Sequence, residues 1–136
     1  MIWLDSTFVI DFLYEAADHH DAAVQWMTDR SDAAIGTHPI VVFEVVRGTQ
    51  SQADLERTQA FLQTLAVPSF NAGAAVDAGR FDRSHRRDGD VLSPRDTIIA
   101  AGAIEANATL VTRDRDFANV STLNYRFYDD ISGSST

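Results

Sequence analysis

Residues 93–117 read SPRDTIIAAGAIEANATLVTRDRDF, and this stretch decides the fold. Ser93 and Pro94 are typical of a helix start, and the apolar pattern behind them predicts a helix through Ile104. Residues 109–112 predict a short buried strand, which a polar RDRDF loop follows. A helix that leads directly into a buried strand is typical of an α/β domain, and here acidic residues lie at both ends of the unit.

The same alternation of strands and helices extends outward from this stretch. Further strands are predicted over residues 2–4, 33–37, 66–70 and 125–128. Further helices are predicted over residues 6–13, after His19, and over residues 39–47, 52–65 and 72–87. Strands that alternate with helices predict the α/β class, with a central, mainly parallel sheet flanked by helices.

Length and composition indicate one domain with a single core. The chain has 136 residues, of which 45% are hydrophobic. We expect residues 1–130 to form this domain and residues 131–136 to be a flexible tail. The absence of cysteine excludes disulfides and thiolate zinc sites. Because the N-terminus lacks the basic segment of a signal peptide and no stretch reaches the ~18 apolar residues of a membrane helix, we expect a cytoplasmic protein with no membrane partner.

The charge of the chain limits the kinds of partner it can bind. Its net charge is -9, and its 11 basic residues are all arginine. Such an acidic chain does not bind nucleic acid through a broad basic face, although a nuclease remains compatible because metal ions supply local positive charge. The lack of lysine also excludes receiver domains and haloacid-dehalogenase-like phosphatases, whose sites need one.

Five acidic residues lie beside apolar segments where strands should end or helices should begin. They are Asp5, Glu44, Asp96, Asp114 and Asp116. A carboxylate next to the core is costly unless it is paired, hydrogen-bonded or bound to a metal, and there is no lysine to pair with these. Asp5 and Asp114 directly follow predicted strands, and parallel sheets bind ligands at that edge. The placement predicts that these carboxylates converge on a divalent cation. We expect few positively charged side chains nearby.

Each residue also has an ordinary structural interpretation. Asp5 can cap the first helix, and Asp96 can interact favourably with the dipole of its helix. Glu44 can lie on a solvated helix face or pair with Arg47. The two late aspartates can be plain turn residues. It is the joint placement at one sheet edge that favours a site.

Three segments resemble PIN domains, and more closely the VapC-type ribonuclease toxins of toxin–antitoxin pairs. They are the opening MIWLDSTFVIDFL, the internal VVFEVVRG and the late block quoted above, so that the resemblance extends from residue 1 to about residue 117. It implies a three-layer PIN-like α/β fold and a site for Mg2+, with Mn2+ able to substitute. Whether one or two ions bind stays open.

The resemblance also implies roles for individual residues. It implies catalytic roles for Asp5, Glu44, Asp96 and Asp114, and metal ligation by Asp5, Asp96, Asp114 and Asp116. It implies that Thr7 and Thr112 support the site, although many relatives carry Asn at the position of Thr7. The short TRDRDF loop leaves the separate roles of Asp114 and Asp116 open.

The function implied by the resemblance is a metal-dependent endoribonuclease. It would be a toxin that inhibits translation by cutting RNA, with tRNA and rRNA both open, and a cognate antitoxin would neutralise it. A homodimer is expected through apolar side chains of the first two helices, namely Phe8, Phe12, Leu13 and Trp26. Two alternatives remain: a structure-specific DNA nuclease, and a non-catalytic module whose acidic cluster binds arginines of a partner.

Arginines supply weaker candidates for substrate contact. Arg80, Arg83, Arg86 and Arg87 fall on one face of a predicted helix, where they either pair with nearby aspartates or contact RNA. Arg113 and Arg115 lie inside the acidic loop and either pair with Asp116 or contact substrate. From these we predict that Arg86, Arg87 and Arg113 bind substrate.

Overall fold

A four-stranded parallel sheet forms the centre of the molecule in the computed structural model, which describes residues 1–30, 32–87, 89 and 92–130. The strands are β1 (Ile2–Leu4), β2 (Ile35–Gly36), β3 (Thr109–Thr112) and β4 (Asn124–Phe127), in the order β2-β1-β3-β4. Every pair is parallel, and Ile2 is in register with both Ile35 and Thr109. All the carboxyl ends of the strands therefore meet at one edge.

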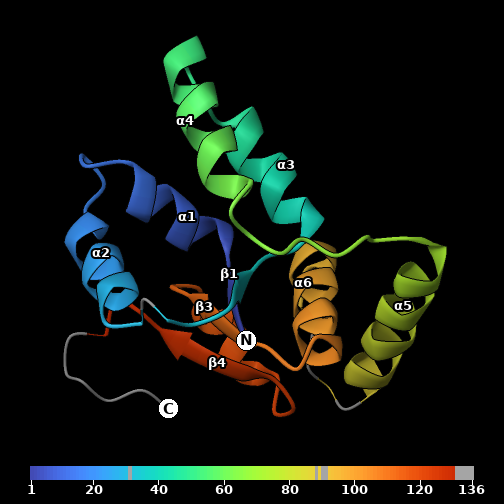
Figure 1. Cartoon of the computed structure of the whole chain (residues 1–136). Helices are drawn as coiled ribbons and strands as arrows, with labels where there is room; N and C mark the ends of the chain where they lie inside the picture. Colours follow the sequence, from blue (N-terminus) through green and yellow to red (C-terminus); the bar gives the residue numbers. More distant parts are fainter. Residues whose placement is uncertain (31, 88, 90–91, 131–136) are drawn as a thin grey trace.

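Helices cover both faces of this sheet. They are α1 (Ser6–Leu13), α2 (His20–Thr28), α3 (Pro39–Arg47), α4 (Gln52–Leu62), α5 (Ala72–Arg87) and α6 (Pro94–Glu105). Figure 1 shows α1 and α2 on one side of the strands and α5 with α6 on the other. The predicted three-layer α/β architecture is confirmed. None of the helices in the described part of the chain has the length and apolar character needed to cross a membrane.

The core lies where the two central strands meet the helices. Trp3, Leu110 and Val111 are fully buried, which explains why these strands read as continuous apolar segments rather than alternating ones. Phe8 of α1 is also fully buried, and its ring lies 5.8 Å from that of Trp26 and 4.8 Å from that of Tyr128. The expectation that Phe8 forms a dimer surface is therefore wrong, because this side chain is inside the domain.

Two local predictions differ from the structure. Residues 66–70 do not form a strand: Ala66 makes one parallel bridge with Gly36, and Pro68, which has no N–H, cannot extend a ladder. A Cβ at Gly36 would lie 2.5 Å from the carbonyl oxygen of Ala66, so that only glycine allows this approach. The last three residues of the RDRDF loop instead begin a 3-10 helix, η1 (Arg115–Asn119), which Asp114 caps. The predicted tail, residues 131–136, lies outside the described residues.

The end of α6 fixes how β3 enters the sheet. Asn107 adopts a left-handed conformation with φ 52°, and the N–H groups of Asn107 and Ala108 donate to the carbonyls of Ile104 and Ala103. This pair of bonds is the Schellman ending of a helix. It turns the chain directly from α6 into β3, so that the start of the helix and the end of the strand lie on the same side of the molecule.

Candidate metal centre

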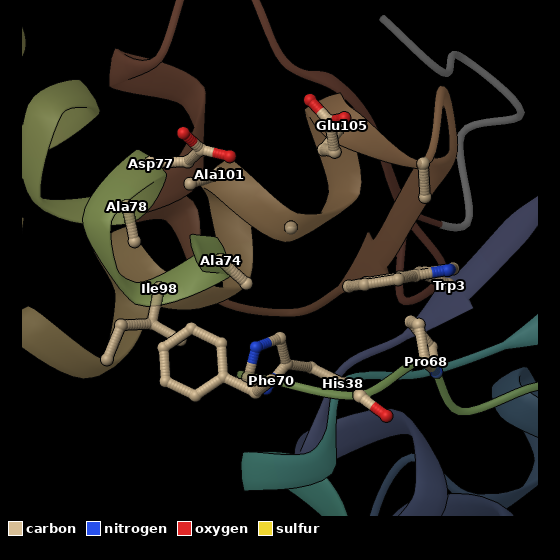
Figure 2. Close-up of a pocket in the computed structure, with 13 residues that line it drawn as sticks. Trp3, His38, Pro68, Phe70, Ala74, Asp77, Ala78, Ile98, Ala101 and Glu105 are labelled. Carbon is tan, nitrogen blue, oxygen red and sulfur yellow. The ribbon is translucent and has the colours of Figure 1, made fainter. Parts of the chain in front are cut away.

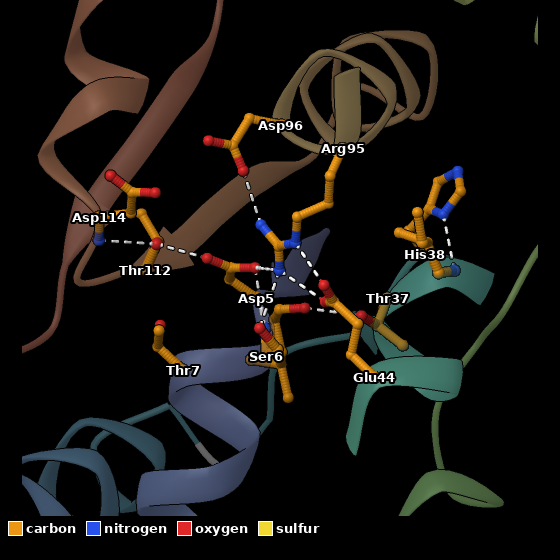
Figure 3. A network of polar contacts seen from close by, with 12 residues as sticks. Asp5, Ser6, Thr7, Thr37, His38, Glu44, Arg95, Asp96, Thr112 and Asp114 are labelled. Carbon is orange, nitrogen blue, oxygen red and sulfur yellow. Dashed lines mark hydrogen bonds and ion pairs between the residues drawn. The ribbon is translucent and has the colours of Figure 1, made fainter. Parts of the chain in front are cut away.

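Asp5 lies at the end of β1 and caps α1. Its Oδ1 accepts a hydrogen bond from the Ser6 N–H at 2.8 Å, and its Oδ2 accepts one from the Thr112 hydroxyl at 2.7 Å. The side chain is 1% exposed. The capping interpretation is confirmed, and the same carboxylate also faces the other acidic residues (Figure 3), so its role in a site stays a prediction.

Asp96 comes to the same edge from the first turn of α6. Ser93 caps this helix by accepting a hydrogen bond from the Asp96 N–H, and Pro94 occupies the first helical position. Burial raises the pKa of Asp96, and the charges of Asp114 and Asp5 raise it further, although a hydrogen bond from Arg95 opposes the rise. The raised pKa is therefore mainly an effect of burial, which disfavours the charged form of the carboxyl.

Asp114 and Asp116 follow β3 at the same edge. Asp114 caps η1, with its Oδ1 accepting a hydrogen bond from the Asp116 N–H at 2.9 Å. The fully buried Thr112 hydroxyl links this loop to β1, since it accepts from the Asp114 N–H at 3.0 Å and donates to Asp5. One carboxylate oxygen from each of Asp96, Asp114 and Asp116 lies within 4.8 Å of the others.

Arg95 lies at the centre of the cluster, and the sequence analysis assigned it no role. Its guanidinium donates to Asp5, Glu44 and Asp96, with every N···O distance 2.7 Å, and to the Ser6 hydroxyl at 2.8 Å. Figure 3 shows the guanidinium between the three carboxylates. The expectation of few internal cations is corrected here: the cation is an arginine beside Asp96 in sequence.

Glu44 joins the cluster through this arginine. It projects from the middle of α3, and each of its carboxylate oxygens accepts a hydrogen bond from Arg95, one from Nε and one from Nη2. Arg47, the alternative partner for Glu44, instead lies over the ring of Phe43 at 5.6 Å. Burial alone would lower the pKa of Arg95, but the hydrogen bonds and charges of the carboxylates outweigh it and raise that pKa. The arginine is therefore a permanent positive charge.

The cluster has two sides with different charge balance. We call Asp5, Glu44 and Arg95 the bridged side, and Asp96, Asp114 and Asp116 the open side; the Oδ1 atom of Asp96 connects the two. Among the described residues, no cation pairs with Asp114 or Asp116. Three converging carboxylates are the oxygen donors that Mg2+ and Mn2+ prefer, so the open side fits such an ion.

Thr7 and Arg113 lie beside the cluster. The Thr7 hydroxyl accepts a long hydrogen bond, 3.4 Å, from the Arg113 N–H. The Arg113 side chain donates from Nε to the buried carboxylate of Asp11 at 2.7 Å, and the Tyr128 hydroxyl donates to the same oxygen. Burial and this bond to Asp11 raise the pKa of Tyr128. In this conformation the Arg113 side chain is bonded within the domain.

Two other candidate arginines, Arg86 and Arg115, pair with aspartates outside the cluster. Arg86 is paired with Asp82 one turn earlier on α5, yet its side chain is 66% exposed, and Arg87 next to it is exposed. Arg115 pairs with Asp129 at 2.9 Å rather than with Asp116. Arg86 and Arg87 therefore remain accessible to a large ligand at the end of α5.

An apolar hollow between α5, α6 and the start of β1 lies outside this cluster. Its volume is about 190 Å3, and its walls include Trp3, His38 and Phe70 (Figure 2). His38 is buried and caps α3 by accepting from the Ile40 N–H through Nδ1; burial, and then the charge of Arg95, lower its pKa. Among the described residues, the acidic groups that converge closely enough to share a metal ion are those at the sheet edge.

Comparisons with known proteins place the chain among PIN domains. The PIN domain family profile matches residues 2–123. No curated protein matches the chain in sequence.

Solved structures share its fold at low identity. The FitAcB structure from Neisseria gonorrhoeae has a TM-score of 0.78 at 19% identity, covering 96% of this chain and 100% of that one. VapBC2 from Rickettsia felis, bound to a DNA fragment from its promoter, has a TM-score of 0.73 at 22% identity, covering 92% and 97%. VapC20 from Mycobacterium tuberculosis, a toxin that cleaves the sarcin-ricin loop, has a TM-score of 0.69 at 15% identity, covering 89% and 95%.

Proposed function

The chain belongs to the PIN domain family, and we propose that it is a metal-dependent endoribonuclease of the VapC toxin type. The observation that carries this proposal is the open side, where carboxylates from the start of α6 and from the loop after β3 converge, and where Asp114 and Asp116 have no cation partner among the described residues. This is an arrangement that binds a hard divalent ion at the edge of a parallel sheet.

The residues of the open side would hold Mg2+ or Mn2+. When bound, such an ion lowers the pKa of a coordinated water and stabilises negative charge on a phosphodiester. Thr112 orients Asp5 and the start of the loop after β3, because its hydroxyl donates to Asp5 and accepts from the Asp114 N–H. Arg95 orients Glu44 by holding both its oxygens, and Thr7 supports the loop through the Arg113 N–H.

RNA is the substrate class that we propose. A structural neighbour at 15% identity is described as a toxin that cleaves the sarcin-ricin loop, and this supports RNA rather than DNA as the substrate. On this chain, Arg86 and Arg87 offer exposed guanidinium groups suited to phosphate. The main alternative, a structure-specific DNA nuclease, would use the same carboxylates.

A cognate antitoxin is the proposed protein partner, since several neighbours are toxin–antitoxin complexes. A groove of about 310 Å3 between α1, α3 and α4 is lined by Ile10, Tyr14, Val45 and Gly48 among others, and it would accept the apolar face of a helix. An arginine of the antitoxin would find free carboxylates on the open side. We therefore expect the antitoxin to weaken Mn2+ binding, and calorimetric titration of the free protein and the complex tests this.

A homodimer is also proposed, through exposed apolar side chains rather than through Phe8, which lies inside the domain. Phe43, Val76 and Ile10 are exposed by 61%, 58% and 41%, whereas Phe8 is buried. Such exposed apolar side chains are candidates for a contact between copies. Light scattering at micromolar concentration, without antitoxin, tests the dimer, and a monomer mass would contradict it.

The test of the activity is a cleavage assay with matched RNA and DNA strands. We expect the purified protein to cut RNA with Mg2+ or Mn2+ and to stop when a chelator is added. Preferential cutting of DNA would favour the DNA nuclease. No cleavage of either strand by the folded, metal-loaded protein would favour the non-catalytic acidic module.

A further inference from the structure

The guanidinium of Arg95 occupies the bridged side as a bound cation would. It makes five hydrogen bonds, to oxygen atoms from the end of β1, from the start of α1, from α3 and from α6. Its side chain is 26% exposed, while that of Asp5 is 1% exposed. Charge-assisted bonds of this kind, with a bidentate fork to one carboxylate, are the strong class of side-chain hydrogen bonds.

The donors around Asp5 leave it little capacity to bind a metal as well. Its Oδ1 accepts from the Ser6 N–H and from Arg95, and its Oδ2 accepts from the Thr112 hydroxyl. One lone-pair position of the carboxylate remains, on Oδ2, so a metal ion on Asp5 would be held by that oxygen alone unless it displaced a donor, and one of the three donors is itself a charged group. Both oxygens of Glu44 are likewise bonded to Arg95.

The open side differs in this respect. Arg95 bonds to Asp96 only at Oδ1, and among the described residues nothing donates to the Oδ2 atom of Asp96 or to the side chain of Asp116. A divalent ion can therefore bind there without displacing the guanidinium.

From this contrast we infer that Arg95 takes the place of a second metal ion, so that the protein binds one divalent ion per chain, on the open side. This inference rests on the proposed metal-dependent function. In sites with two ions, the second ion neutralises carboxylates and helps to neutralise the phosphodiester. Here a permanent guanidinium balances Asp5 and Glu44, and it holds Glu44 in place. Arg95 is a positioning residue, and Asp5 supports it rather than ligating the metal directly.

The test is the stoichiometry of Mn2+ binding, measured by calorimetry on the whole chain. We expect one ion for the wild type and two for Arg95→Gln, because the amide leaves Asp5 and Glu44 without a cation. Arg95→Lys keeps the positive charge and should stay at one. Arg57→Ala is the control: it also removes one arginine from an ion pair with an aspartate, Asp54, but in α4. It should bind one ion.

Electron paramagnetic resonance gives a second readout that does not depend on activity. Two Mn2+ ions held close together couple their spins, and we expect that coupling only in Arg95→Gln. If this variant is unstable without metal, Mn2+ should raise its melting temperature by more than it raises that of the wild type.

The outcomes separate this inference from the proposed function. Two ions on the wild type, or one ion on Arg95→Gln with unchanged affinity, would overturn the role of Arg95 and leave the metal site standing. No Mn2+ on any variant would overturn the metal-dependent function and, with it, the inference.

Discussion

The bridged side and the open side both contain carboxylates, and they differ in how much positive charge balances the negative charge of those carboxylates. On the bridged side, Arg95 forms ion pairs with the buried Asp5 and with the partly exposed Glu44. On the open side, Asp114 and Asp116 pair with no cation among the described residues, and the pKa of Asp96 is raised by burial and then by the charges of Asp114 and Asp5. A carboxylate on the bridged side thus contributes to stability, whereas one on the open side is available for chemistry. Substitutions on the two sides should separate these effects.

The largest effect is expected on activity, from the open side. Asp96→Asn removes the carboxylate that connects the two sides, and we expect RNA cleavage to fall by at least about 100-fold, as for the loss of a group that stabilises transition-state charge. Cleavage rates at saturating Mn2+ measure this. Asp21→Asn makes the same charge change in the exposed first turn of α2 and should leave the rate unchanged. Wild-type rates for Asp96→Asn would rule out the assigned site.

The next largest effect is expected on stability, from the bridged side. Asp5→Asn leaves the Arg95 guanidinium without its buried partner, and breaking such a pair costs roughly 3 kcal/mol of unfolding free energy. Asp116→Asn removes only an exposed, repelled charge and should change the unfolding free energy by less than about 0.5 kcal/mol. Urea unfolding without metal compares the two variants. Equal losses of stability would mean that the two sides do not differ as described.

The features that depend on neighbouring residues in the sequence were predicted, whereas those that depend on contacts between distant residues were not. The parallel sheet and its acidic edge follow from local patterns, because Asp5 directly follows one short apolar strand, Asp114 lies two residues after another, and Asp96 lies just inside a helix start. The family profile confirms the PIN assignment made from the same segments. The metal ligands themselves remain predictions.

Arg95 could not be identified in the same way. It is next to Asp96 in sequence, yet four of its five hydrogen bonds reach residues 51, 89 or 90 positions away. No periodicity within one helix reports such contacts. Arg95 stands beside Asp96 in SPRD, but that local pattern does not distinguish it from the other arginines of the chain. The exposure of Phe8 was misjudged for a related reason, since only the packing of Trp26 and Tyr128 shows that its ring is covered.

A smaller effect is expected at Thr112, which connects the two sides. Thr112→Val keeps the shape of the side chain but removes the hydroxyl that donates to Asp5 and accepts from the Asp114 N–H. We expect a loss of about 1–3 kcal/mol of unfolding free energy, because a buried donor and acceptor lose their partner. Mn2+ affinity should fall by roughly 10-fold or more, as for other groups that orient metal ligands. Thr112→Ser should restore both, and a variant Thr112→Val with unaltered Mn2+ affinity would show that the hydroxyl does not orient the open side.

The smallest expected effect is a shift in the pH midpoint of Mn2+ binding, which reports on Asp96 and the charges around it. Burial, followed by the charges of Asp114 and Asp5, raises the pKa of Asp96, so this carboxyl keeps its proton to a higher pH than an ordinary aspartate does. The proton and the metal compete for the same group, so Mn2+ affinity should fall as pH falls, by about tenfold per pH unit once the pH is below that pKa. Calorimetric titrations from neutral pH downward measure the profile. Asp114→Asn removes one source of repulsion and should move the midpoint to lower pH, even though it weakens binding overall. A midpoint that stays in place in this variant would mean that Asp114 does not act on Asp96, and the open side would then lack the mutual repulsion that distinguishes it from the bridged side.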